Sequence, residues 1–98
     1  MIKIKKQGNL ITITGHANYS DSDDIVCASV SSIMYTTVNA IMQFDKEAIS
    51  FKDDGDKVTI EILNENDITD KLIDNMMALY KELEVKYPKN VKIIKEEM

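Results

Sequence analysis

Short strand-like runs alternate along this chain with two long helical runs, and their order leaves few ways to bury both helices. The strand-like runs combine β-branched residues with a period of two, which is the pattern of a half-buried strand. They are residues 2–5, 10–14, 48–51, 57–63 and 91–94. Turn signals at Gly8-Asn9 and at residues 53–56 join the first four runs into two hairpins.

Each hairpin is followed by one helical run. The first extends over about 25–44 and follows a polar segment, 15–24, which ends in typical N-cap residues. The second opens near Asp67, carries apolar residues at spacings of three and four, and ends at Pro88. The predicted order is β-β-α-β-β-α-β. Two helices packed on one face of a mostly antiparallel sheet would bury both apolar stripes, so the sequence predicts an α+β fold. In the first helix we expect the buried stripe at Ile25, Ala28 or Ser29, Ser32 or Ile33, Val38, and Ile41 or Met42.

Length and charge limit the classes of function. With 98 residues, the chain is expected to form a single domain over residues 1–98, and a homodimer would add to a core of this size. A net charge of −5 disfavours direct nucleic-acid binding and favours a basic partner. We expect no signal peptide, and no run approaches the ~20 apolar residues of a membrane span. The single cysteine forms no internal disulfide and indicates a reducing compartment, which predicts a cytoplasmic location.

The chain has one histidine and one cysteine, His16 and Cys27, predicted at the end of the second strand and in the first turn of the first helix. The first amides of a helix are unpaired and partly positive, so they stabilise a thiolate and could form an oxyanion hole. The pair therefore fits nucleophilic catalysis by cysteine with histidine as the base. The spacing alone leaves the alternative open, because a free cysteine often fills core space and a lone histidine is often structural.

Two short motifs carry a family resemblance. Gly15-His16-Ala17, a polar loop, and then Asp24-Ile25-Val26-Cys27-Ala28-Ser29-Val30-Ser31 resemble the signature of the ribosomal-processing cysteine protease family Prp. The resemblance implies a catalytic dyad with Cys27 as nucleophile and His16 as general base and acid. It also implies that Asp24 orients His16 and that Ser31, one helical turn after Cys27, supports the thiol. The alternatives are an N-cap carboxylate at Asp24 and a small packing residue at Ser31.

The resemblance also implies a substrate. Prp proteases remove a short N-terminal extension from large-subunit ribosomal protein L-twenty-seven, act as homodimers and use no cofactor. A basic ribosomal protein suits an acidic enzyme. We expect no metal, because one cysteine and one histidine do not make a zinc site and the 53–56 turn lacks the rest of an EF-hand loop.

Two other classes of function stay open on the residues alone. In the first, the chain is a non-catalytic ribosome-associated or protein-binding module, and Cys27 is a core residue. In the second, Cys27 is a redox sensor, although the chain has no second cysteine to resolve an oxidised thiol.

Overall fold

The computed structural model describes residues 1–20 and 24–95, which form seven elements. The elements are β1 (Ile2–Gln7), β2 (Leu10–Thr14), α1 (Ile25–Phe44), β3 (Ile49–Asp53), β4 (Lys57–Ile62), α2 (Asp67–Lys86) and β5 (Val91–Lys95). The predicted order β-β-α-β-β-α-β is therefore confirmed.

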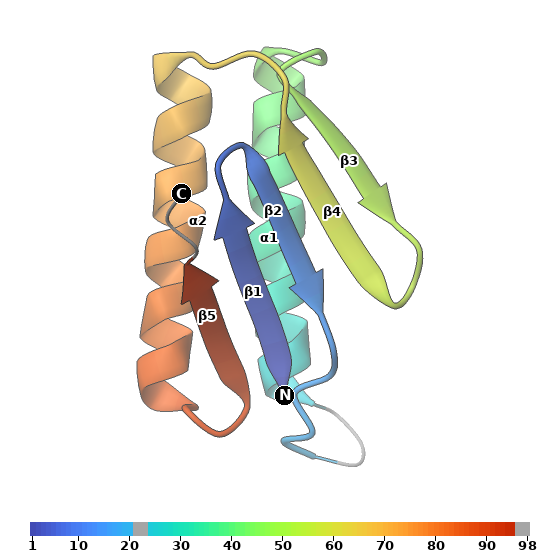
Figure 1. Ribbon diagram of the computed structural model, residues 1–98, viewed down its shortest axis with the longest axis vertical. Coiled ribbons are helices and arrows are strands. Elements are labelled where there is room, and N and C mark those ends of the chain that lie inside the picture. The colour runs from blue at the N-terminus through green and yellow to red at the C-terminus, as the bar shows by residue number, and fades with distance from the viewer. Residues whose placement is uncertain (21–23, 96–98) are drawn as a thin grey trace.

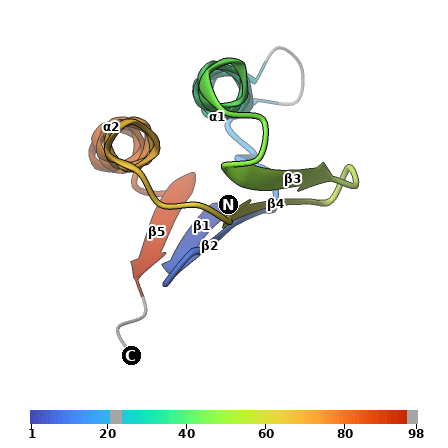
Figure 2. The same ribbon diagram turned by 90° about the horizontal axis from the view of Figure 1, so that it is seen from above.

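The strands form one five-stranded sheet in the order β3-β4-β2-β1-β5. Three of its four pairings are antiparallel, whereas β1 and β5 pair in parallel. Figure 2 shows α1 and α2 side by side on one face of this sheet. The predicted α+β fold, a mostly antiparallel sheet with two helices on one face, is confirmed.

The core lies between the helices and the sheet. It consists of the inward-facing residues of the strands, among them Ile4, Ile11 and Ile60, and of one stripe on each helix. Tyr80 of α2 is fully buried, and its hydroxyl donates a hydrogen bond of 2.9 Å to the carbonyl of Val30 in α1. This bond satisfies the one polar atom that Tyr80 brings into the core and joins the two helices.

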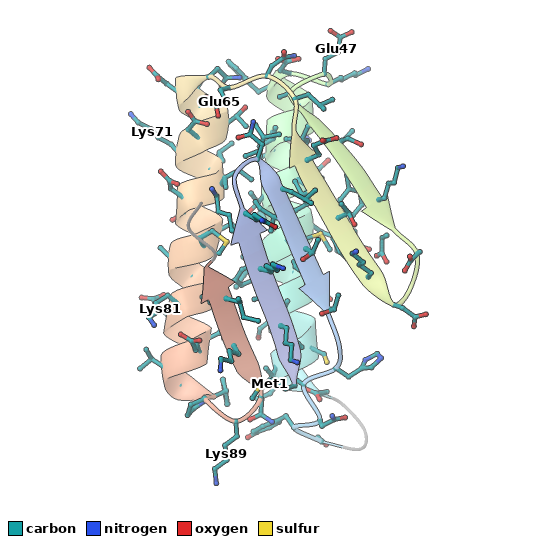
Figure 3. All side chains as sticks on the ribbon, viewed as in Figure 1. Met1, Glu47, Glu65, Lys71, Lys81 and Lys89 are labelled. Atoms are coloured by element: carbon teal, nitrogen blue, oxygen red, sulfur yellow. The ribbon has the colours of Figure 1, made fainter. Side chains whose placement is uncertain are left out.

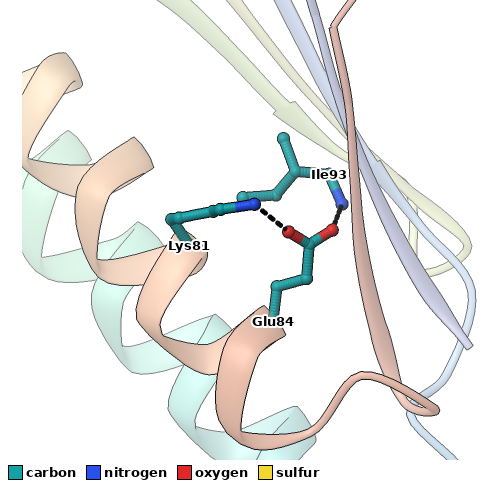
Figure 4. A network of polar contacts seen from close by, with 3 residues as sticks. All are labelled: Lys81, Glu84 and Ile93. Carbon is teal, nitrogen blue, oxygen red and sulfur yellow. Dashed lines mark hydrogen bonds and ion pairs between the residues drawn. The ribbon is translucent and has the colours of Figure 1, made fainter.

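The edge strand β5 is tied to α2 by a side chain. Glu84 accepts hydrogen bonds from the Ile93 N–H and from Lys81, each at 2.8 Å (Figure 4). The bond from Lys81 is the main reason that the pKa of Glu84 lies below its usual value, and the Ile93 N–H lowers it further. The carboxylate thus accepts a hydrogen bond from a backbone N–H at the edge of the sheet, beyond which residues 1–20 and 24–95 place no further strand.

The buried stripe of α1 differs from the one expected. Val26, Val30 and Met34 are buried, whereas Ile25, at 51% exposure, faces outward; the expectation held at Val38 and Ile41. No residue of α1 is charged, so its polar face is weakly marked and apolar spacing does not single out one side. The exposed Ile25 and the partly buried Ile33 line an open groove of about 600 Å³ together with Leu79 and Leu83 of α2.

The same uncharged helix corrects the expectation that no run is long and apolar enough to span a bilayer. Among the described residues, α1 meets that test with 20 residues and a hydropathy of 1.5. Core helices of soluble proteins meet it too, and α1 packs its buried stripe into the core described above.

Candidate active site

His16 and Cys27 come together in one pocket. It has a volume of about 170 Å³ and lies where the end of β2, the first turns of α1 and the β3–β4 hairpin meet. His16 follows β2 by two residues and is exposed, whereas Cys27 is the third residue of α1 and is partly buried. Both therefore lie where the sequence predicted them, and both side chains line the pocket.

Gly15 sets the course of the chain between β2 and His16. Its φ is +87°, a conformation that residues with a Cβ rarely adopt, and a Cβ here would collide with the carbonyl oxygen of Met1. Only glycine therefore lets the chain turn closely past the start of β1 and bring the next residue to the pocket.

The sulfur of Cys27 accepts a hydrogen bond from the loop that follows His16. The donor is the N–H of Ala17, 3.3 Å from Sγ, and Ala17 itself is 1% exposed. A donor at the sulfur stabilises a thiolate more than a thiol, because the charged acceptor forms the stronger bond. The residue next to the histidine thus contacts the atom that would act as nucleophile.

Asp24 is the N-cap of α1. Its Oδ1 accepts hydrogen bonds from the N–H groups of Val26 and Cys27, both at 3.0 Å, and its Oδ2 accepts one from Tyr19, also at 3.0 Å. The bond from the Cys27 N–H is the main reason that the pKa of Asp24 lies below its usual value, and burial opposes it. The N-cap alternative is therefore the arrangement observed, and an orienting role toward His16 stays a prediction.

The capping bonds change the expected electrostatics of the site. The sequence suggested that unpaired amides at the start of α1 would support the thiolate and form the oxyanion hole. In the structure the amides of Val26 and Cys27 already donate to Asp24, so the expectation is wrong for these two groups. The amide that does reach the sulfur, that of Ala17, comes from the loop after β2.

Ser31 lines the same pocket as His16 and Cys27, one helical turn beyond the cysteine, and is exposed. This position is compatible with the expected support of the thiol, which stays a prediction.

The β3–β4 hairpin forms the far wall of the pocket, which the sequence interpretation missed because it treated residues 53–56 only as a turn. Asp53, Asp56 and Lys57 line the wall. Asp53 accepts a hydrogen bond of 2.6 Å from the hydroxyl of Tyr35 in α1, which lowers the pKa of Asp53 and raises that of Tyr35. The site therefore has an acidic wall held against α1.

A second missed residue is Asn90, in the turn between α2 and β5. Its side-chain amide donates to the carbonyl of Ala17 at 2.9 Å, across 73 positions of sequence. No local pattern in the sequence could have indicated this contact.

The described residues, 1–20 and 24–95, contain no group of three or more histidine, cysteine, aspartate or glutamate side chains that could hold a metal ion. The expectation that the site uses neither metal nor cofactor stays a prediction.

Comparison with known families gives one match over nearly the whole chain. Residues 1–92 match the family described as cysteine protease Prp. The chain is also 26% identical, over 98 residues, to the ribosomal processing cysteine protease Prp of Staphylococcus aureus, with 94% of this chain and 92% of that protein covered.

Solved structures agree with this fold. An S. aureus Prp with a covalently linked product peptide has a TM-score of 0.85 at 24% identity, covering 97% of each chain. An S. aureus Prp with a substrate peptide has a TM-score of 0.82 at 21% identity, again over 97% of each chain. A Streptococcus mutans protein has a TM-score of 0.73 at 22% identity, over 97% of this chain and 93% of that one.

Proposed function

Because the chain belongs to the Prp family of cysteine proteases, we propose that it removes the N-terminal extension of large-subunit ribosomal protein L-twenty-seven. Cys27 is the nucleophile and His16 the general base and acid. These two residues are assigned because both side chains line one pocket, in which the Ala17 N–H donates a hydrogen bond to the cysteine sulfur.

The reaction is an acyl transfer. His16 takes the proton of Cys27, and Sγ attacks the carbonyl carbon of the scissile peptide bond. The resulting oxyanion forms beside the sulfur, where the Ala17 N–H is available as a donor. His16 then protonates the leaving amine, a thioester remains on Cys27, and water attacks the thioester to release the extension and the free thiol.

The choice of a ribosomal substrate draws on two observations. The S. aureus relative is named as a ribosomal processing protease. The chain has a net charge of −5, and Asp53 and Asp56 line the pocket, which favours a basic substrate. Because a free thiol needs a reducing environment, the cytoplasm is the proposed compartment.

The test is cleavage of the extended ribosomal protein by purified enzyme, followed by mass spectrometry of the new N-terminus. The wild-type chain should remove the extension, and Cys27→Ala should reduce the rate to background, a loss of at least about 10³-fold. Ser29→Ala is a matched control, since Ser29 lies in the same turn of α1 but bonds to the Ile25 carbonyl. It should cleave at nearly the wild-type rate.

Cleavage by Cys27→Ala at the wild-type rate would contradict the mechanism. A chain that binds the ribosomal protein but leaves its extension intact would instead support the binding-module alternative.

A further inference from the structure

Both backbone polar groups of Ala17 are held by side chains. Its N–H donates to Cys27 Sγ at 3.3 Å, and its carbonyl accepts from Asn90 Nδ2 at 2.9 Å. Ala17 is nearly inaccessible to solvent, so water does not readily replace either bond. The backbone of this one residue therefore connects the sulfur to the turn between α2 and β5.

Asn90 is itself fixed on both sides. Its backbone N–H donates to the Tyr87 carbonyl at 2.9 Å, and its carbonyl accepts from the Ile2 N–H at 2.8 Å. The α2–β5 turn and the segment after β2 lie at the same end of the molecule (Figure 1). These two hydrogen bonds therefore fix the backbone of Asn90, from which its side-chain amide extends, to the end of α2 and to β1.

The Ala17 carbonyl needs such a restraint. The next residue, Asn18, has a φ of +56°, in the left-handed region that residues other than glycine populate sparsely, although asparagine is enriched among them. The backbone therefore changes direction sharply at the peptide group between Ala17 and Asn18. The backbone preferences of these two residues alone do not fix the orientation of that group. The ring of Tyr19 meets that of Tyr87 edge-on at 5.3 Å, a second contact between the same two segments.

We propose that Asn90 is a positioning residue for Cys27: by holding the Ala17 carbonyl, its side-chain amide fixes the Ala17–Asn18 peptide group and with it the Cα of Ala17, next to the N–H that donates to the sulfur. The inference rests on the proposed function, in which Cys27 is the nucleophile. The N–H on the sulfur belongs to the peptide group that Ala17 shares with His16, so the position of Ala17 also affects the backbone of the general base. Without the hydrogen bond from Asn90, the Ala17–Asn18 peptide group can rotate and the backbone of Ala17 can shift, so its N–H is no longer held at the sulfur.

The experiment compares Asn90→Ala and Asn90→Asp with Asn64→Ala. Asn64 is a matched control, because its side-chain amide also donates to a backbone carbonyl, that of Glu47, at 3.1 Å. Figure 3 places Glu47 and Lys89, the neighbour of Asn90, at opposite ends of the molecule. Each amide makes one hydrogen bond to a backbone carbonyl, exposed for Asn64 and partly buried for Asn90, and only the bond of Asn90 is near Cys27.

Two quantities are measured for each variant. The first is the rate of alkylation by iodoacetamide at mildly acidic pH, where the fraction of thiolate limits the rate. The chain has a single cysteine, so the mass of the intact protein reports Cys27 alone. The second is kcat and KM for cleavage of the extended ribosomal protein.

Both Asn90 variants should alkylate about fivefold more slowly and lose about tenfold or more in kcat, with KM within about twofold. Asn64→Ala should stay within about twofold of wild type in all three quantities. Simple destabilisation would act in the opposite direction on alkylation, since an unfolding chain exposes its thiol. Asn90→Asp keeps the size of the side chain, so it carries the test if Asn90→Ala does not fold.

The inference is overturned if the folded Asn90 variants match Asn64→Ala in alkylation and kcat. That failure differs from failure of the proposed function, which would appear as cleavage that persists in Cys27→Ala. If the wild-type chain does not cleave the ribosomal protein, the alkylation rates still decide the role of Asn90.

Discussion

Asp24 illustrates how one side chain orders the loop beside the site. Its carboxylate accepts hydrogen bonds from backbone N–H groups on both sides, from Tyr19 in the loop and from Val26 and Cys27 in the helix. It therefore fixes the start of α1 relative to the segment that carries His16, whether or not it also orients the imidazole.

We predict that Asp24→Asn is less stable than wild type at neutral pH and that its stability depends less on acid. The folded-state pKa of Asp24 is lowered, so its contribution is present above the unfolded value of 3.8 and is lost as the pH falls through the folded value. Urea denaturation from pH 7 to pH 2.5 measures this. The difference in free energy of unfolding between wild type and variant should shrink toward the acid end.

Glu84→Gln is a useful control, since Glu84 also has a lowered pKa but bonds to Lys81 and Ile93 rather than to the site. It should likewise reduce the acid dependence of stability while leaving peptide cleavage at neutral pH unchanged. If the difference in free energy of unfolding between wild type and Asp24→Asn stays constant with pH, the result contradicts the role given to the Asp24 carboxylate.

At the scale of elements, the sequence predicted the strands and α2 well because each carries its own local period, and it predicted α1 because N-cap residues precede a long uncharged run. The hairpin turn signals and Pro88 also marked boundaries that the structure retains to within about two residues. The parallel pairing of β5 with β1 was not predicted, since it joins the two ends of the chain. The stripe of α1 was misplaced because no charged residue marks its outer face.

In the candidate site, too, the sequence indicated some residues and missed the contacts made by others. His16 and Cys27 were singled out because each is unique in the chain and lies near the boundary of a predicted element, and the resemblance to the Prp motifs supplied their catalytic roles. The hydrogen bonds of Ala17 to Cys27 and Asn90 were not predicted, nor was the wall formed by Asp53, Asp56 and Lys57. These contacts depend on how distant elements pack.

The contact between the two helices yields a prediction of its own. Tyr80→Phe should lower the free energy of unfolding by about 1–2 kcal/mol, because the buried Val30 carbonyl loses its hydrogen bond from the hydroxyl. Tyr35→Phe, which removes an exposed hydroxyl bonded to Asp53, is the comparison and should cost less. Urea denaturation at neutral pH measures both, and an equal or larger loss for Tyr35→Phe would contradict the weight given to the buried bond.

At the scale of the whole molecule, the expected homodimer is open to direct measurement. The single chain has several large apolar side chains in solvent, including Ile25, Phe44 and Val85. A second copy could cover part of this surface. Light scattering coupled to size-exclusion chromatography should give twice the chain mass of 11.1 kDa at micromolar concentration. A mass of one chain at every concentration tested would contradict the prediction.

The proposed mechanism requires Cys27 to form a covalent bond to the substrate, and this thioester can be observed directly. The extended ribosomal protein is mixed with excess enzyme, quenched with acid within the first turnover, and the intact enzyme mass is recorded. We predict a wild-type mass increased by that of the acylating extension, mapped by fragmentation to Cys27, and no increase for Cys27→Ala. Cleavage that proceeds without any adduct, or an adduct on another residue, would contradict the account.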